Sequence, residues 1–288
     1  MFIKGDCVKH PNAPDWGIGK VLENALDDKV KIFFVNVGEK LLNLKHVNLI
    51  KLEGVDAIHP ILDNPGLADR GKGKKFKSLP QAKAEFLAVY PDGFEDGGYC
   101  NDERSYKIEA HKLMLKLLDE VTFKQLLEVA DFKEICKRAL QVVNKTNLIF
   151  PNEKMALKDG LATEKAEKLF AESLYSLLYG KNDLRERFKV FSDCLYEINA
   201  AKWTTMSYFL FITYPSDHMF LKPTVTQNSA DLCAFELNYR SELNWLTYKC
   251  LLEFSAYLNS ALVELELEPR DMIDVQSFMW CIAPNQLK

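Results

Sequence analysis

Residues 200–231 contain an amine and carboxylates that are able to do covalent chemistry. Lys202 precedes Trp203 at the start of a predicted helix, and Asp217 and Asp231 follow farther along the chain. A lysine becomes a nucleophile when burial lowers its pKa, and a carboxylate stabilises a neighbouring cation or accepts a proton. A lysine amine together with a carboxylate therefore suits a reaction in which a cationic carbon forms and is captured by the amine. The alternative is that Lys202 only faces solvent at a helix start.

The sequence around Lys202 resembles the catalytic segment of a known enzyme superfamily. It reads Lys202-Trp203-Thr204-Thr205-Met206-Ser207-Tyr208-Phe209, and eleven residues later it is followed by Phe220-Leu221-Lys222-Pro223-Thr224. The segment is similar to that of the helix-hairpin-helix DNA glycosylases. The resemblance implies that Lys202 is the Schiff-base lysine of bifunctional members, or that Trp203 is the aromatic residue of monofunctional ones.

The chain departs from the superfamily at two points. The position of the superfamily's aspartate falls at Pro223-Thr224, so the catalytic carboxylate is predicted to be Asp217 or Asp231. Further candidate carboxylates are Glu153, Asp102 and Glu103. The hairpin glycines are replaced by Ile198-Asn199-Ala200-Ala201, which weakens the expected contact of hairpin amides with a DNA phosphate.

A second segment resembles the loop that these enzymes insert into a duplex. It reads Val142-Val143-Asn144-Lys145-Thr146-Asn147-Leu148-Ile149-Phe150. An enzyme that acts on a base must extrude it and fill the gap, and polar and apolar side chains on one loop suit that task. Asn144 and Asn147 are the predicted DNA-binding residues. The alternative is a helix C-cap before a turn at Pro151.

Aromatic residues near Lys202 are candidates for a base pocket. Trp203, Tyr208 and Phe220 are the predicted lining, although aromatic side chains at helical spacing are more often core. The last predicted helix follows Pro269-Arg270-Asp271 and carries Asp274 and Trp280. It resembles the closing acid-then-Trp helix of the superfamily, but a helix cap and a buried core tryptophan explain the same residues.

Residues 1–52 are predicted to form a small β unit. Period-two runs of apolar residues, separated by turn-forming residues, indicate about five short strands. The pattern Gly5-Asp6-x-Val8-x-His10-Pro11-Asn12-x-Pro14-x-Trp16-Gly17-Ile18-Gly19-Lys20-Val21, closing with Val37-Gly38-Glu39-Lys40-Leu41, resembles the DUF3553 family, which is similar to Tudor-like modules. The resemblance implies an SH3-like barrel that contacts DNA or a DNA-bound protein. Trp16 and His10 lie on its rim or pack inward.

Charge is distributed unevenly along the chain. Residues 1–80 carry 13 Lys/Arg and 10 Asp/Glu, whereas the rest carries 24 and 31, within a net charge of -4. The basic excess lies mostly in Arg70-Gly71-Lys72-Gly73-Lys74-Lys75-Phe76-Lys77, and Lys72, Lys74, Lys75 and Lys222 are predicted to hold DNA phosphates. The alternative for residues 70–77 is a solvated linker.

Composition narrows the class of protein. The chain has 288 residues, 48% of them hydrophobic, which is enough for one small and one larger domain. No apolar run reaches the length of a membrane span, and the start lacks the apolar core of a signal peptide, so we expect a cytoplasmic protein with no membrane contact. Seven scattered cysteines and five scattered histidines predict reduced thiols, no metal and no cofactor.

The overall prediction is an α+β multidomain protein. An SH3-like barrel (residues 1–52), a basic linker (53–80) and an all-α, DNA glycosylase-like domain (81–288) are expected. The predicted function is excision of a modified base from double-stranded DNA, such as a modified cytosine of phage DNA in antiviral defence, leaving an abasic site. The alternatives are a non-catalytic module that binds DNA or a partner, and a transcription-associated factor whose barrel contacts RNA polymerase.

Overall fold

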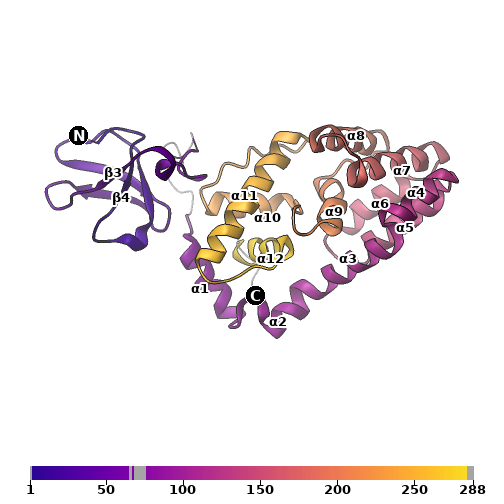
Figure 1. The fold of residues 1–288 in the computed structure, drawn as a ribbon, viewed down its shortest axis with the longest axis horizontal. Helices are drawn as coiled ribbons and strands as arrows, with labels where there is room; N and C mark the ends of the chain where they lie inside the picture. Colours follow the sequence, from indigo (N-terminus) through magenta and orange to yellow (C-terminus); the bar gives the residue numbers. More distant parts are fainter. Residues whose placement is uncertain (1, 65–66, 68–75, 284–288) are drawn as a thin grey trace.

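The chain folds into a small β-sheet followed by a larger helical region (Figure 1). This computed structural model describes residues 2–64, 67 and 76–283. The strands are β1 (Cys7–Lys9), β2 (Ile18–Val21), β3 (Lys29–Phe34), β4 (Gly38–Asn43) and β5 (Ile50–Leu52).

The sheet is antiparallel, with the strand order β4-β3-β2-β1-β5. Its own core contains Val8, Val21, Val30, Ile32, Phe34 and Leu49. Gly19 lies on β2 where a Cβ would come within 2.6 Å of the Phe34 ring, so the close packing of β2 on β3 requires glycine. The predicted strands are confirmed. The described pairings form an open sheet with β4 and β5 at its two edges.

The helical region begins with the longer helices α1 (Leu79–Val89) and α3 (Ser105–Leu118), which are linked by short turns. These turns are η4 (Gly93–Glu95), α2 (Gly97–Tyr99) and the π turn η5 (Cys100–Arg104). The remaining helices are α4 (Glu120–Glu128), α5 (Phe132–Asn144), α6 (Pro151–Gly160), α7 (Glu164–Tyr179), α8 (Leu184–Glu197), α9 (Trp203–Thr213), α10 (Pro223–Leu232), α11 (Trp245–Glu264) and α12 (Met272–Ile282). In Figure 1, α1 and α10–α12 gather beside the sheet, α4–α8 lie at the far end, and α9 lies between the groups.

Two helix boundaries differ from the periodicity of the sequence. The apolar pattern over residues 123–143 predicts one helix, but α4 ends at Glu128 and α5 begins at Phe132. Ala130 has a φ of 57°, and Asp131 caps α5 by accepting from the Glu134 amide. The left-handed residue and the cap together end one helix and start the next.

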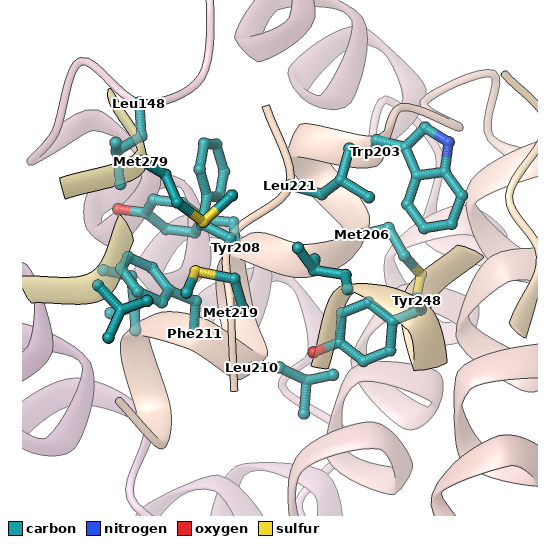
Figure 2. Close-up of a cluster of buried hydrophobic side chains, with 14 of the residues drawn as sticks. Leu148, Trp203, Met206, Tyr208, Leu210, Phe211, Met219, Leu221, Tyr248 and Met279 are labelled. Carbon is teal, nitrogen blue, oxygen red and sulfur yellow. The ribbon is translucent and has the colours of Figure 1, made fainter. Parts of the chain in front are cut away.

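Helix α9 is the centre of the helical core. All of its residues are buried, because neighbouring helices cover every face. Figure 2 shows that Trp203 and Tyr208 leave α9 on opposite sides, Trp203 toward Met206 and Tyr248, and Tyr208 toward Met279.

The sheet is fastened to the helical region by apolar contacts. Ile61, Leu62 and Leu67, which follow β5, are buried in the same core cluster as Leu22 and Phe33 of the sheet. Phe33 also contacts Phe76 edge to face, with ring centroids 5.0 Å apart. Residues 61, 62 and 67, within the range predicted as a linker, are therefore packed.

Candidate functional site

Lys202 lies at the N-cap of α9 and is exposed to solvent. Its neighbour Trp203 is buried, and the indole Nε1 donates a hydrogen bond to the Arg240 carbonyl at 2.8 Å. The tryptophan anchors the start of the helix in the core, while the lysine amine stays in water.

Lys222 lies at the N-cap of the next helix, α10, in different surroundings. Its Nζ is 4.4 Å from the ring centroid of Trp280 and 4.9 Å from that of Phe150, so the amine is held between two aromatic side chains. Burial lowers the pKa of Lys222, and the nearby carboxylates Glu103 and Glu153 oppose this shift. The sequence predicted Lys222 as a phosphate contact, and the structure places it in a half-buried site.

Glu153 is fixed in the first turn of α6. Its Oε2 accepts a hydrogen bond from Thr204 Oγ1 at 2.9 Å and another from the Phe150 amide at 3.3 Å. These contacts join the start of α6 to the first turn of α9. The positive end of the α6 dipole further favours a carboxylate here.

Glu103 is presented by the π turn η5. The Nζ of Lys107 donates to Glu103 Oε2 at 3.3 Å and to Ser277 Oγ at 2.8 Å. Lys107 is completely buried, and burial lowers its pKa while Glu103 raises it. A π turn often occurs where a chain must place a functional side chain, and here it carries Glu103, whose charge raises the pKa of Lys222 against the effect of burial.

A buried ion-pair network ties η5 to α12. Arg104 donates to Asp271 at 2.7 Å and to Asp274 at 2.8 Å, and Arg270 Nε donates to Asp274 at 2.8 Å. Tyr99 also donates to Asp274, at 2.5 Å. Burial alone would raise the pKa of Asp274, but hydrogen bonds from Arg270, Tyr99 and Arg104 hold it below its usual value. Asp271 is the N-cap of α12, whereas the sequence left the cap open between Asp271 and Asp274.

The loop predicted to enter DNA lies next to Lys222. Asn144 ends α5, Asn147 follows it, and both side chains are exposed. The same loop ends at Phe150, whose ring contacts Lys222. Beside Asn144, a surface cavity of about 350 Å³ is lined in part by Lys154. The structure therefore brings together two of the predicted features, the loop and Lys222.

Asp217 and Asp231 lie elsewhere. Asp217 is exposed in the turn after α9, beside a cavity lined by Arg187, His218 and other residues. Asp231 is exposed near the end of α10, about 13 Å along the helix axis from Lys222. The carboxylates whose charge acts on Lys222 are Glu103 and Glu153.

The predicted base-pocket aromatics lie in the core. Trp203, Tyr208 and Phe220 are each no more than 3% exposed. The rings of Tyr208 and Phe220 are 6.4 Å apart, but Trp203 lies on the other side of α9 (Figure 2). The aromatic residues at the candidate site are Phe150 and Trp280. The sequence analysis gave no signal that Phe150 and Trp280 both contact Lys222.

Other predicted features lie apart from this site. Lys72, Lys74 and Lys75 fall outside the described residues. A cavity of about 960 Å³ lies between the sheet and α11, where Ile18, Phe235 and Tyr257 form part of its wall. In the part of the chain that the structure describes, no cluster of three His, Cys, Asp or Glu side chains is suited to a metal, and no helix is long and apolar enough to cross a bilayer. None of the seven cysteines forms a disulfide bond.

Comparison with known proteins gives one family. Residues 2–52 match a family described as protein of unknown function, DUF3553. No curated protein and no solved structure matches the chain. The family match covers the sheet, so the helical region has to be interpreted from its own side chains.

Proposed function

We propose that this protein is a DNA glycosylase in which Lys222 is the reacting amine. The observation that supports this proposal is the half-buried Lys222, held between Phe150 and Trp280, where the charges of Glu103 and Glu153 also act on it. A buried amine with a lowered pKa is more often neutral, and only the neutral amine is a nucleophile. The same segment that resembles the glycosylases by sequence thus contributes the amine, twenty residues after Lys202.

The reaction uses the amine and the two carboxylates in separate roles. The neutral Lys222 amine attacks C1′, and the C1′–N bond breaks with its electron pair leaving on the base nitrogen, which takes up a proton from water. Glu153 accepts the proton that the amine loses, and Glu103 stabilises the positive charge on C1′. The C1′–O4′ bond then breaks, and O4′ takes up the proton held by Glu153, which gives an iminium linkage to Lys222. Water hydrolyses this linkage to return the amine and leave an abasic site, and the proton released neutralises the hydroxide formed when the base was protonated.

The exposed loop is suited to opening the duplex. Asn144 and Asn147 extend into solvent, and Phe150 on the same loop is 51% exposed although its ring contacts Lys222. A side chain that fills the gap must lie close to the group that attacks the extruded nucleotide. The loop meets this requirement because Phe150, on the same loop as Asn144 and Asn147, contacts Lys222.

Double-stranded DNA with modified cytosines is the proposed substrate, in defence against phages. We further infer that the sheet is an SH3-like module that contacts DNA or a DNA-bound protein. Trp16 supports this inference, since it is half-buried beside His10, with ring centroids 4.9 Å apart, and Lys40 Nζ lies 5.6 Å from its ring. Such a partly covered aromatic surface suits an interaction site.

The test uses genomic DNA from phages with modified or unmodified cytosines. We expect abasic sites and released bases from the modified DNA, and a covalent adduct on Lys222 after borohydride reduction, located by mass spectrometry. Lys222→Gln should abolish both signals, and Lys202→Gln should retain both.

Two outcomes would contradict the proposal. Salt-sensitive duplex binding without base release would indicate the non-catalytic module instead. Capture of RNA polymerase without affinity for DNA would indicate a transcription-associated factor.

A further inference from the structure

Helix α6 presents two lysines to a single cavity. Lys154 and Lys158 line the cavity of about 350 Å³ beside Asn144, which we call the α6 cavity. Residues four apart on a helix lie on the same face, so the two ammonium groups point to the same side. Asp159 is the carboxylate of the wall, and its remaining residues are apolar. The α6 cavity therefore combines two cations with one anion and an exposed amide.

The two lysines of the α6 cavity are not neutralised within the fold. Lys154 Nζ donates to the Thr146 carbonyl at 2.6 Å, and among the described residues neither Lys154 nor Lys158 forms an ion pair. Burial lowers the pKa of Lys154, so an anion that arrives in the cavity stabilises its ammonium form. Two ammonium groups without a carboxylate partner are suited to an anion from outside the protein.

The other cavities on the molecule have the opposite charge. Glu253 and Glu264 line the cavity between the sheet and α11, and His59 is its other titratable side chain besides Tyr257. Glu120 and Asp217 outnumber Arg187 in the cavity after α9. Carboxylates repel a phosphate, so these two walls are unsuited to nucleic acid. The helical part of the chain is acidic as a whole, and the α6 cavity is an exception to that charge.

The segment that resembles the glycosylase hairpin has its amides engaged. Ile198, Asn199 and Ala200 donate their amides to carbonyls in the last turn of α8, at 3.0, 3.1 and 2.8 Å, and the Lys202 amide donates to the Ala200 carbonyl at 2.9 Å. Asn199 has a φ of 55°, so the segment is the left-handed C-terminal cap of α8. Amides that close a helix in this way are not available to hold a phosphate.

The cavity at this segment is also acidic. Asp159, Glu197 and Lys165 are its charged residues, and Lys165 Nζ is already paired with Glu197 Oε1 at 2.7 Å. Helix α6 extends from this cavity to the α6 cavity, and its last residue, Gly160, packs so closely that a Cβ would collide with the Ile198 carbonyl. The lysines that are suited to a phosphate thus lie on the same helix, nearer to the loop after α5.

We propose that the α6 cavity binds a phosphate of the DNA backbone and takes the place of the hairpin amides. This inference rests on the proposed function, from which it takes DNA as the partner. Lys154 and Lys158 contact the phosphate oxygens as charges, and Asn144 donates an uncharged hydrogen bond. Asn144 is the end of α5, where the exposed loop begins, so the bound phosphate lies on the strand that the loop enters.

The experiment measures the affinity for an unmodified DNA duplex over a range of salt concentrations. Lys158→Gln should make the plot of log K against log salt shallower by about one, because one contact that releases a counterion is lost. Lys154→Gln should have the same effect. Asn144→Ala should weaken binding without changing the slope, because an uncharged contact releases no counterion.

Lys165→Gln is the matched control. It removes the same single charge, but from the cavity at residues 197–199, and it should leave the slope unchanged. Lys158 makes no described hydrogen bond, so its variant tests the site without disturbing the loop that Lys154 holds through Thr146. An unchanged slope in both Lys158→Gln and Lys154→Gln would overturn the inference. Equal changes in these variants and in Lys165→Gln would overturn it too, because only net charge would then matter.

Failure of the glycosylase proposal is distinguishable from failure of this inference. If the lysine variants change the salt slope as expected but no DNA releases a base, the enzymatic proposal fails and the phosphate site stands. If modified DNA does release bases and the slope is the same in the wild type, Lys154→Gln and Lys158→Gln, the phosphate site fails and the enzymatic proposal stands.

Discussion

The N-caps of α9 and α10 are alike in backbone but unlike in surroundings. Lys202 has φ −127° and ψ 143°, Lys222 has φ −102° and ψ 106°, and each lysine precedes a helix. Lys202 is exposed, whereas Lys222 contacts Phe150 and Trp280 and has a lowered pKa. The difference shows that a lysine at a helix start becomes a candidate nucleophile through the elements packed over it.

The elements over Lys222 come from distant parts of the chain. Phe150 belongs to the loop between α5 and α6, and Trp280 belongs to the last helix. At the start of α9, the Trp203 side chain points into the core, where it contacts Phe188 and donates to the Arg240 carbonyl. Among the described contacts, no aromatic side chain covers Lys202. One tryptophan supports the fold and the other shapes a site.

Exchange of each lysine for glutamine gives the largest predicted contrast. Lys222→Gln should lower the rate of base release by about a thousandfold, because the nucleophile is lost. Lys202→Gln should stay within about twofold of the wild type, because its amine is in water. Single-turnover release of labelled base measures both. Equal losses in the two variants would remove the distinction between the N-caps.

Exchange of each tryptophan for alanine should lower stability more at the N-cap of α9 than at that of α10, the opposite of the order predicted for base release. Trp203→Ala should lower the free energy of unfolding by about 3–5 kcal/mol, because a core side chain and its hydrogen bond to Arg240 are lost. Trp280→Ala should cost about 1–2 kcal/mol, because the ring is half-exposed. Urea denaturation measures both values, and a larger cost for Trp280 would show that it too is mainly structural.

Glu153→Gln should slow base release by about a hundredfold, because the amide cannot accept the proton from Lys222. Its amide oxygen still accepts from Thr204 and from the Phe150 amide, so the melting temperature should change little. Asp217→Asn is the matched control, since that carboxylate is exposed in the turn after α9. A slow Asp217→Asn variant with a normal Glu153→Gln variant would return the catalytic carboxylate to the position predicted from the sequence.

The pH dependence of base release should show the smallest difference between the variants. Burial lowers the pKa of Lys222 from 10.5, so the rate should rise with pH and reach its midpoint below that value. Trp280→Leu should move the midpoint upward, because water reaches the amine more easily. Since the native state binds fewer protons than the unfolded state above the lowered pKa, the contribution of Lys222 to stability should rise up to about pH 10.5. A midpoint unmoved by Trp280→Leu would exclude the ring as the cause of the shift.

Local patterns predicted much of the secondary structure. Alternation along β2 and β3 gave the strands, and the helical period gave most of the helices. Helix α10 was not predicted because it is short and polar and starts at Pro223, and a proline indicates the end of a helix as often as its start. The break between α4 and α5 near Ala130 was not predicted because the helical spacing of apolar residues continues across it.

The candidate site was only partly predictable. Lys222, Glu153 and Glu103 were all named from the sequence, but not as a group, and Lys222 was assigned to phosphate binding. Their proximity depends on packing between the α5–α6 loop, η5 and the starts of α6 and α10, and no short-range pattern encodes such contacts. Two of the three aromatic residues predicted to line a pocket, Trp203 and Tyr208, lie on α9, and that helix is buried on every face.

The packed residues after β5 determine how the sheet can cooperate with the helices. Since Ile61, Leu62 and Leu67 lie in one core cluster with Phe33 and the buried residues of the helices, the sheet packs directly against the helical region. A binding module on a flexible linker samples many distances from the rest of the protein, whereas a module packed against its neighbour keeps one distance and one orientation. If the sheet binds DNA or a DNA-bound protein as proposed, that partner would lie at one distance and in one orientation relative to Lys222.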